Sequence, residues 1–377
     1  MTNIAIVNRT NLKNYGSVLQ VYALCAAVRK LGYEPEVVWQ KGNMSRNFDI
    51  RPNKAIMTAS RLIAHPSLLW STIKTIREVK SHAIDGRKVK KFDDFVAANF
   101  KQSFYDQGEL IKIAKSDRYA KFVCGSDQIW CTTTLYPDPM MYLRFAPEEK
   151  RVAYAPSLGR NYIPDYNKKT LRKFINGVPC LSVREDEGAR LVKELTGRDA
   201  TVVADPTLLL NMADWDRLKA DIETPEKYVL CYFLDEPSDE VKEAICRHAN
   251  ESGNDIVTLG VLGNLDYPQE KVHSPIAGPG EFITLTSKAD MVITDSYHGM
   301  LFAINYHKKF WSVKRAYSQF DQSSRQLTVL SRLGLTERYV TAHPDFTDIG
   351  VDYAATQVKI NEFTASSINY LKKSLEK

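Results

Sequence analysis

The chain has 377 residues, of which 44% are hydrophobic and 25% charged, a composition that excludes disordered and fibrous proteins; the length predicts two domains. The net charge is +6, and we find no recognisable nucleic-acid-binding module, so no nucleic-acid partner is expected. No apolar run approaches the roughly 18 residues of a membrane-spanning helix, and the first ten residues lack the features of a secretory signal. We therefore expect a cytoplasmic protein.

The chain alternates strand-like and helical patterns almost throughout. Short apolar runs predict strands at 3–9, 34–39, 121–130, 151–159, 180–185, 200–210, 227–235, 255–261, 290–294 and 310–314. Helical patterns occupy 15–32, 186–197, 239–250, 280–289 and 299–307. Strands separated by helices of this length favour parallel sheets with crossover helices, that is, an α/β fold.

The domain organisation follows from one polar stretch, at 211–227. It predicts an N-terminal domain over 1–210 and a C-terminal domain over 225–360. A last helix over 361–377 is expected to pack back on the first domain.

The positive charge is concentrated in residues 51–91. This segment contains ten Lys or Arg and two acidic residues, a balance of +8, which leaves −2 for the rest of the chain. Leu, Ile and Trp recur in it at roughly helical spacing. Two interpretations stay open: a solvated helical excursion from the first domain, or a patch that contacts an anionic membrane surface or a lipid diphosphate.

Polar residues at strand ends are the candidate site residues, because ligands of open parallel sheets bind outside the carboxyl ends of the strands. Tandem α/β domains also predict a cleft between them. The candidates in the first domain are Asn14, Gly16, Ser17, Ser126, Asp127, Gln128 and Arg184. Those in the second domain are Asp295, Ser296, His298 and Arg315.

The sequence TDSYHG places His298 in the first turn of a helix that follows a buried strand. Free N–H groups and the helix dipole attract anions at this position. The imidazole could move a proton or hold a phosphate. Asp295 and Ser296 could instead be helix caps.

Other candidates also have structural interpretations. Asp127 could orient a sugar hydroxyl or a catalytic group, or it could cap the next helix. Gly16 lets the backbone approach a ligand closely, and Arg184 could simply pair with Glu185 or Asp186. The loop GPGE, which contains Glu281, is too short for a dinucleotide fingerprint, although the helix that follows could face the cleft. Because the six cysteines form no CxxC pair and no HExxH, Walker or metal-spaced motif occurs, we expect no metal.

Several stretches together resemble the polysaccharide pyruvyl transferase family. They are NYGSVLQVYALCAAVRKLGYE, FVCGSDQIW, RVAYAPSLGR, LSVREDEGARLV, VVADPTLLL, EFITLTSKADMVITDSYHGMLFAI and SSRQLTVLSRLGLTERY, in this order. The resemblance covers about residues 4–340, but not the basic segment or the C-terminal tail. It implies a glycosyltransferase-B-like fold, with two Rossmann-like domains whose parallel sheets face a central cleft.

The resemblance also implies an activity: transfer of the enolpyruvyl unit of phosphoenolpyruvate to a sugar, with release of phosphate. The family's motif histidine falls on His298, the arginine after paired serines on Arg325, and the SVRE arginine on Arg184. Some relatives carry an arginine where this chain has Ser296. Phosphate binding is therefore expected from Arg325, Arg315 or Arg184.

The partners implied are phosphoenolpyruvate, as a substrate rather than a cofactor, and a saccharide acceptor from surface-polysaccharide synthesis, free or lipid-linked at the inner face of the membrane. Two alternatives stay open. A nucleotide-sugar-dependent glycosyltransferase on the same fold would release a nucleotide. A non-catalytic carbohydrate-binding protein would tolerate substitution of His298.

Overall fold

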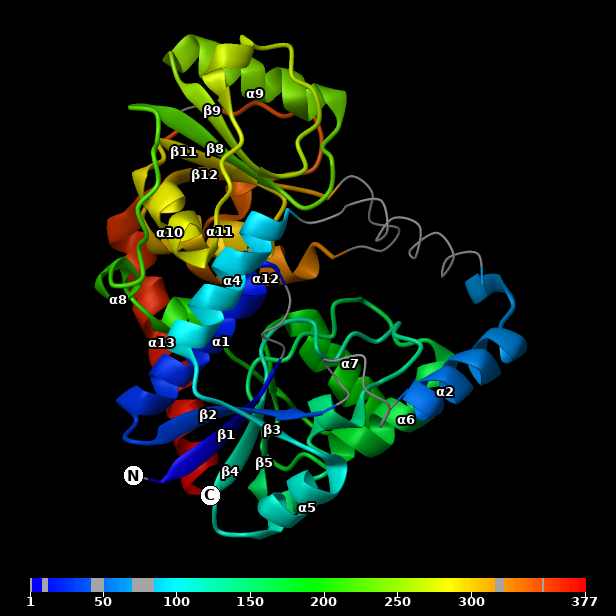
Figure 1. Cartoon of the computed structure of the whole chain (residues 1–377). Helices are drawn as coiled ribbons and strands as arrows, with labels where there is room; N and C mark the ends of the chain where they lie inside the picture. Colours follow the sequence, from blue (N-terminus) through cyan, green and yellow to red (C-terminus); the bar gives the residue numbers. More distant parts are fainter. Residues whose placement is uncertain (1, 9–12, 42–50, 70–84, 316–321, 348) are drawn as a thin grey trace.

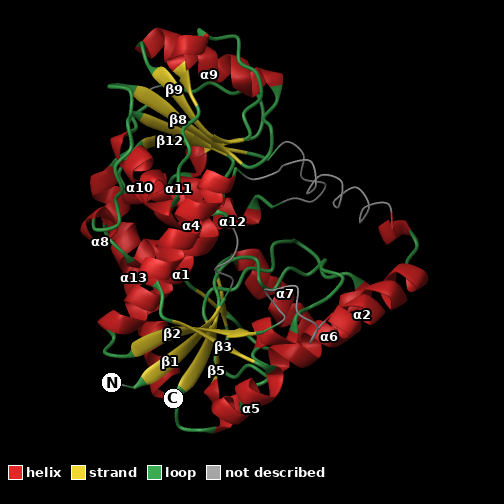
Figure 2. Ribbon diagram, viewed as in Figure 1, coloured by secondary structure: helices red, strands yellow, loops and turns green. Residues whose placement is uncertain are grey.

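Two parallel β-sheets form the framework of the computed structural model, which describes residues 2–8, 13–41, 51–69, 85–315, 322–347 and 349–377 (Figures 1 and 2). The first sheet has the order β3-β2-β1-β4-β5: Gln102–Tyr105, Glu34–Gln40, Asn3–Val7, Lys121–Cys124 and Arg151–Ala153. The second has the order β10-β9-β8-β11-β12-β13: Val272–His273, Asp255–Gly260, Tyr228–Phe233, Met291–Thr294, Lys309–Val313 and Tyr339–Val340. A separate pair contains β6 (Ser182–Val183) and β7 (Thr201–Val202).

Helices connect and cover these strands. The α-helices are α1 Tyr15–Lys30, α2 Arg51–Ala64, α4 Gly86–Asn99, α5 Gln107–Lys115, α6 Asp165–Asn176, α7 Asp186–Thr196, α8 Met212–Asp216, α9 Asp239–Ser252, α10 Pro279–Lys288, α11 Tyr297–Asn305, α12 Ser324–Leu333 and α13 Tyr353–Glu376. The 3₁₀ helices are η1 Pro139–Tyr142, η2 Glu148–Lys150, η3 Pro206–Leu209, η4 Gln269–Lys271 and η5 Thr336–Arg338.

The central strands are buried on both faces, as helices on both sides of a parallel sheet require. All six residues of β8 and all four of β11 are buried. In each sheet the strand order reverses once, between β1 and β4 and between β8 and β11. Such reversals open a crevice at the carboxyl ends of the strands. The expected α/β fold with two Rossmann-like domains is confirmed.

The short elements differ from the sequence-based prediction. The strand β3 and the helices α5 and α6 were not predicted, because QSFY and the nine residues of α5 are too short to show a clear period and α6 is mostly polar. The strands β6 and β7 have only two residues each, fewer than the runs predicted at 180–185 and 200–210, and they are not part of the first sheet. The last helix, α13, begins at Tyr353, eight residues before the predicted start at 361.

One hydrophobic cluster spans both sheets, and a second cluster lies within the C-terminal domain alone. A single cluster of buried side chains runs from β1 through α1 to α10, α11 and α12. Tyr15, the first residue of α1, stacks on Phe282 of α10 with ring centroids 4.7 Å apart, and its hydroxyl donates to the Ala277 carbonyl at 3.0 Å. The helix α13 packs on α12 and also on η3. Its Tyr370 hydroxyl donates to the Ala153 carbonyl of β5 at 3.1 Å.

The basic segment contains two described helices, α2 and α4. The Arg61 side chain of α2 is buried, donates to the Thr134 carbonyl at 3.2 Å and lies over the Tyr166 ring. In α4, Lys91 pairs with Glu281 of α10. Residues 70–84 lie outside the described residues, so the predicted membrane patch stays a prediction there.

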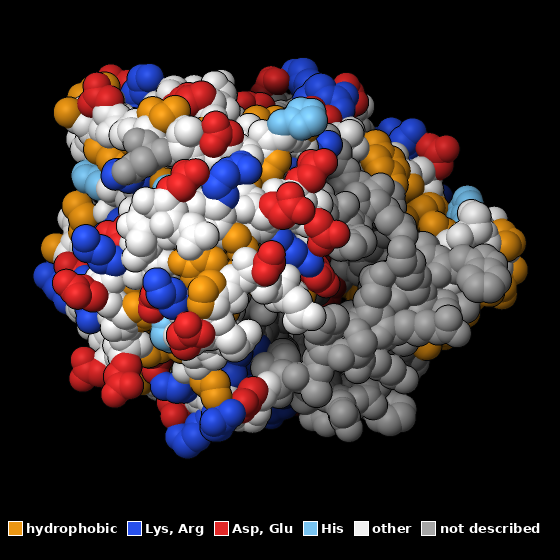
Figure 3. All heavy atoms as spheres, turned by 90° about the horizontal axis from the view of Figure 1, so that it is seen from above, with side chains coloured by type: hydrophobic (Ala, Val, Ile, Leu, Met, Phe, Trp, Pro, Cys, Tyr) orange, Lys and Arg blue, Asp and Glu red, His pale blue; other side chains and the backbone are white. Residues whose placement is uncertain are grey.

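Charges elsewhere are mixed. On the face shown in Figure 3, acidic and basic side chains alternate among the coloured atoms, as expected for a chain whose excess positive charge is confined to 51–91. Among the described helices, none is both long and apolar enough to cross a bilayer.

Candidate functional site

A cavity of about 520 Å³ opens where the carboxyl ends of the two sheets face each other. Its lining comes from both domains, as the reversal of strand order in each sheet predicts. The residues are Asn8, Lys13, Asn14, Ser17, Asp127, Gln128, Ile129, Leu234 and Arg315. Amide, hydroxyl, carboxylate and cationic groups dominate this lining, and a cavity of this size holds a ligand of about one or two sugar units.

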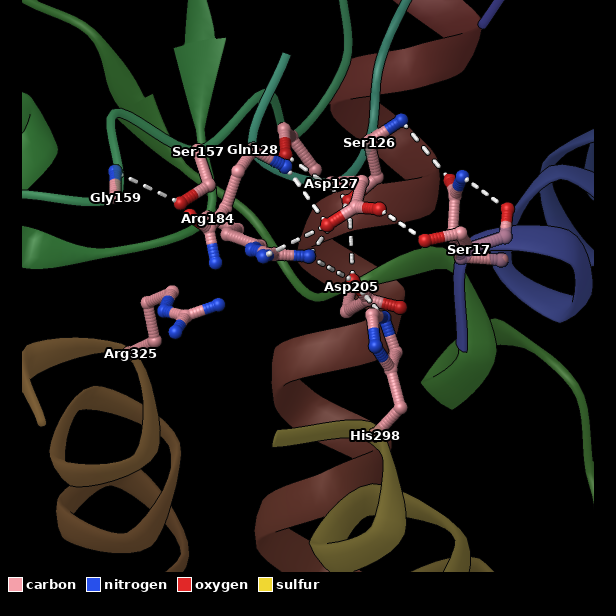
Figure 4. A network of polar contacts seen from close by, with 12 residues as sticks. Ser17, Ser126, Asp127, Gln128, Ser157, Gly159, Arg184, Asp205, His298 and Arg325 are labelled. Carbon is pink, nitrogen blue, oxygen red and sulfur yellow. Dashed lines mark hydrogen bonds and ion pairs between the residues drawn. The ribbon is translucent and has the colours of Figure 1, made fainter. Parts of the chain in front are cut away.

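His298 lies beside this cavity, in the first turn of α11. Ser296 is the N-cap, and its Oγ accepts from Gly299 N at 3.3 Å. The imidazole is 8% exposed, and its Nε2 lies 3.4 Å from Oδ2 of Asp205 (Figure 4). The histidine therefore faces a carboxylate, which favours a proton on Nε2.

Asp205 is fully buried and held at both oxygens. Its Oδ1 accepts from the backbone N of Thr207 at 3.0 Å and from the Thr207 hydroxyl at 2.9 Å. Its Oδ2 accepts from Arg184 Nη1 and from Ser126 Oγ, each at 3.0 Å. Burial alone would raise the pKa of this carboxyl, but His298 and Arg184 hold it well below its usual range. Asp205 is therefore an anion in the native protein.

Gly16 stands against the other side of the imidazole. A Cβ at this position would lie 2.0 Å from Nδ1 of His298, closer than any van der Waals contact. We predicted that Gly16 allows a ligand to approach the backbone. In the structure the close neighbour is the His298 ring, so the glycine is needed for the packing of α1 on α11.

Asp127 contacts polar groups of α1 and of Arg184 within the first domain. Its Oδ2 accepts from Ser17 Oγ at 2.5 Å, and its Oδ1 lies 3.6 Å from Arg184 Nη2. Burial would raise the pKa of this carboxyl, but Arg184, His298 and Ser17 lower it. Asn14 caps α1 by accepting from Ser17 N at 3.1 Å. Asp127 thus lines the cavity as a carboxylate, while Asn14 has a structural role as well.

Two buried arginines lie close to the Tyr297 ring. The guanidinium carbon of Arg184 is 4.6 Å from the ring centroid, and that of Arg325, from α12, is 5.9 Å away. Burial and the neighbouring Arg184 lower the pKa of Arg325 to about 10. Figure 4 shows Arg325 reaching from α12 toward this group. With its amide oxygen turned to Arg325, Gln128 accepts from Nη1 at 2.5 Å and from Nη2 at 3.2 Å.

Several buried polar atoms at this point lack a hydrogen-bond partner among the described residues. The donors among them are Arg184 Nε and Nη2, Arg325 Nε and the Tyr297 hydroxyl. The two Arg184 atoms have only ion-pair contacts, at 3.8 Å to Glu185 and 3.6 Å to Asp127. Buried donors are satisfied in nearly all native structures, so this set indicates room for a bound group with acceptor oxygens.

Arg315 is placed differently. Its Nη2 donates to Asp235 Oδ1 at 3.0 Å, and its Nε lies 2.9 Å from Asp235 Oδ2 as an ion-pair contact. Its Nε is also 3.6 Å from Asp295. Burial raises the pKa of Asp295 to about 6, against the opposing effect of Arg315. Two acids therefore occupy Arg315, which leaves Arg184 and Arg325 as the better-placed anion ligands.

Glu281 is not part of this group. Its Oε2 accepts from Gly278 N at 3.0 Å at the start of α10, and its Oε1 pairs with Lys91 of α4. Neither oxygen lines the cavity. The remaining candidates lie together around the cavity or directly beneath it, with Asp295 and Ser296 acting as a strand-end anchor and a helix cap.

Sequence reasoning missed Asp205, Glu185 and Tyr297 as members of the group. Asp205 fell inside the run predicted as a strand over 200–210, whereas β7 ends at Val202 and leaves Asp205 beyond a strand end, like the other candidates. Tyr297 lies inside the TDSYHG motif itself. Among the described residues, no three His, Cys, Asp or Glu side chains are arranged to hold a metal ion.

The fold and the site define a two-domain α/β protein with a polar cavity between the carboxyl edges of its sheets. The sequence profile of the polysaccharide pyruvyl transferase family matches residues 14–317. Because this match covers most of the chain, the protein belongs to that family and is a transferase of the polysaccharide-modifying kind. None of the curated proteins compared with the chain matches it.

Solved structures with similar folds share little sequence with the chain. The UDP-GlcNAc 2-epimerase from Neisseria meningitidis is 11% identical, with a TM-score of 0.49 over 100% of this chain and 93% of that one. The UDP-GlcNAc 2-epimerase from Methanocaldococcus jannaschii is 11% identical, with a TM-score of 0.44 and coverage of 97% and 93%. An α-glucosyltransferase in complex with UDP and DNA is 10% identical, with a TM-score of 0.47 and coverage of 99% and 94%.

Proposed function

We propose that the protein transfers the enolpyruvyl unit of phosphoenolpyruvate to two hydroxyls of a saccharide, forming a pyruvate ketal and releasing phosphate. The observation that carries this proposal is the buried pair Arg184 and Arg325 with unpartnered donors beside His298. An anion-binding pair next to a proton-transfer group is what this donor requires.

The donor carries a phosphate and a carboxylate. Guanidinium groups bind both as planar forks, and a bound anion would satisfy donors that are otherwise buried without partners. Leaving such donors unsatisfied costs about 1–3 kcal/mol each. The N-terminus of α11, where His298 lies, adds a favourable field for an anion. We therefore assign the donor to the space around Tyr297.

In the reaction, His298 gives a proton to the methylene carbon of the donor, whose double-bond electrons form the new C–H bond. A saccharide hydroxyl then attacks the cationic carbon, and Asp127 accepts its proton, since this carboxylate stays ionised. The bond to phosphate breaks, and a second hydroxyl closes the ketal. Of the two hydroxyl protons, one replaces the proton from His298 and the other leaves with phosphate.

The acceptor belongs in the open cavity. Its amides, the Ser17 hydroxyl and the Asp127 carboxylate suit a polyhydroxylated ligand. We propose a surface-polysaccharide precursor, presented at the cytoplasmic face of the membrane, as the natural acceptor. The +8 balance of residues 51–91 supports this location. Cosedimentation with anionic vesicles but not with neutral ones tests it.

The decisive experiment incubates the protein with phosphoenolpyruvate and galactosyl, mannosyl and glucosyl acceptors, and follows phosphate and product mass. His298→Gln is expected to lower ketal formation by about 10²–10⁴-fold without changing the circular dichroism spectrum. Release of a nucleotide from a nucleotide sugar would support a glycosyltransferase instead. Near-normal turnover in the variant would contradict the role of His298.

A further inference from the structure

We infer that Asp205 holds the proton on Nε2 of His298, so that Nδ1 is the nitrogen that exchanges a proton with the substrate. Asp205 is then a positioning residue that acts through His298. This inference rests on the proposed function for the role of the ring, but the protonation pattern itself can be measured in the resting protein.

The carboxylate of Asp205 has little freedom to rotate. Thr207 binds Oδ1 through two donors, and Arg184 and Ser126 bind Oδ2. A carboxylate that faces Nε2 at 3.4 Å can only accept a proton from it. The lone pair of Nε2 directed at this oxygen would be repelled. The neutral ring therefore keeps its proton on Nε2, and Nδ1 carries the lone pair.

Nδ1 faces the start of α1. It lies against Gly16, and the next residue, Ser17, lines the cavity and donates to Asp127. The N-terminal end of α1 opposes a positive charge on the ring, whereas Asp205 stabilises one. The opposing effects of the α1 N-terminus and of Asp205 suit the role of the His298 ring, which must both bind and release a proton. A side chain larger than glycine at position 16 would occupy the place of Nδ1.

The proton transfer follows from this geometry. The Nδ1–H bond breaks, its electron pair stays on Nδ1, and the proton joins the methylene carbon of the donor. Nε2 keeps its proton throughout, and Asp205 is never protonated. The charged or titratable groups around the ring and its direct neighbours are Asp205, Asp127, Arg184, Arg325 and Tyr297.

The first test is ¹⁵N NMR of the histidine rings, with the His298 signals assigned by their loss in His298→Gln. At a pH where the ring is neutral, we expect the Nε2–H tautomer in the wild-type protein. In Asp205→Asn we expect a mixture of tautomers or the Nδ1–H form. An Nδ1–H tautomer in the wild-type protein would overturn the inference. Because this readout needs no turnover, it stands whether or not the protein uses phosphoenolpyruvate.

The second test uses kinetics. Asp205→Asn is expected to lower kcat by about 10²-fold with KM for phosphoenolpyruvate changed less than about threefold, and to move the alkaline limb of the kcat profile to lower pH. A purely structural role would lower the amount of folded enzyme without moving that limb. An unchanged pH profile in folded Asp205→Asn would contradict the inference.

Asp205→Asn could fail to fold, because it leaves Arg184 buried without its nearest carboxylate. Gly16→Ala leaves the pair of Arg184 with Asp205 intact and acts on His298, whose side chain its Cβ must displace. We expect it to lower kcat by about 10²-fold or more. The matched control is Gly108→Ala in α5, where a Cβ would meet only Asp106 Oδ1 at 3.4 Å. Wild-type kcat in Gly16→Ala would overturn the inference.

Discussion

At the scale of single residues, the candidate site is a cluster of charged side chains that are mostly buried. Three carboxylates, of Asp127, Glu185 and Asp205, surround Arg184. Arg325 also lies near the Tyr297 ring and has no carboxylate partner of its own among the described residues. It is thus the cation with most to gain from a bound anion.

Arg325→Lys should therefore weaken donor binding. Lysine keeps the charge but cannot form the planar fork, so we expect KM for phosphoenolpyruvate to rise about tenfold, or about 1.4 kcal/mol. Arg332→Lys is the matched control, because Arg332 lies on the same helix and pairs with Asp186 at the surface. Steady-state kinetics at saturating acceptor measures both. Equal effects in the two variants would remove Arg325 from the donor site.

Asp295 predicts a pH dependence of stability. Its pKa is about 6 in the folded protein because of burial, against about 4 when unfolded. Because the pKa is raised on folding, Asp295 contributes fully to the free energy of unfolding below about pH 4. This contribution is lost as the pH rises through about 6. Asp295→Asn does not titrate, so its stability relative to wild type should rise over this window, by up to about 3 kcal/mol. Urea unfolding at pH 4, 5, 6 and 7 tests this, and a constant difference would contradict it.

Site residues could be predicted from the sequence where they directly follow a recognisable strand. Asp127, Arg184 and His298 each follow a short apolar run, and the structure brings them together. The ligand role expected for Gly16 stays a prediction, and its contact with His298 could not be foreseen, because a sequence does not show which helix packs against a glycine. Asp205 was missed for the same reason: its importance comes from His298, 93 positions later in the chain.

At the scale of elements, α4 is the contact between the basic segment and the second domain. Glu281 both caps α10 and pairs with Lys91 of α4. The position of this glutamate beside a helix start had suggested ligand binding. Local sequence could not separate the two roles, since an acid in a first helical turn serves either.

Glu281→Gln is accordingly expected to affect stability rather than substrate binding. Loss of the cap charge and of the pair should lower the free energy of unfolding by about 1–2 kcal/mol, with KM for both substrates unchanged. Asp94→Asn, which removes the exposed pair with Lys90, should cost less than about 0.5 kcal/mol. Chemical denaturation measures both values. A rise in KM without loss of stability would return Glu281 to the binding site.

Element prediction succeeded where apolar patterns were long. The runs at β8 and β11 and the helices α1 and α9 were found near their observed bounds. The edge strands of the second sheet, β10 and β13, have two residues each. This is too few to show an alternating pattern. Their positions depend on neighbouring strands that supply the hydrogen bonds, and this information is tertiary.

At the scale of the whole molecule, the two Rossmann-like domains are joined by a continuous core rather than by a mobile hinge. Tyr15 belongs to the first domain but stacks on Phe282 and meets Tyr232 of the second. The helix α13 contacts both α12 and the end of the first sheet. Interfaces of this apolar kind resist relative domain motion, which keeps His298 and Asp127 at a fixed separation.

The two domains should consequently unfold together. We expect a single calorimetric transition in the wild-type protein, because exposing one domain would expose the shared core of the other. Tyr15→Ala removes a fully packed ring and should cost about 3–5 kcal/mol, and it should split or broaden the transition. Tyr162→Ala is the control, since Tyr162 is 42% exposed and its loss should leave the transition unchanged. Two separate transitions in the wild-type protein would show that the domains are independent and that the cavity between them can open.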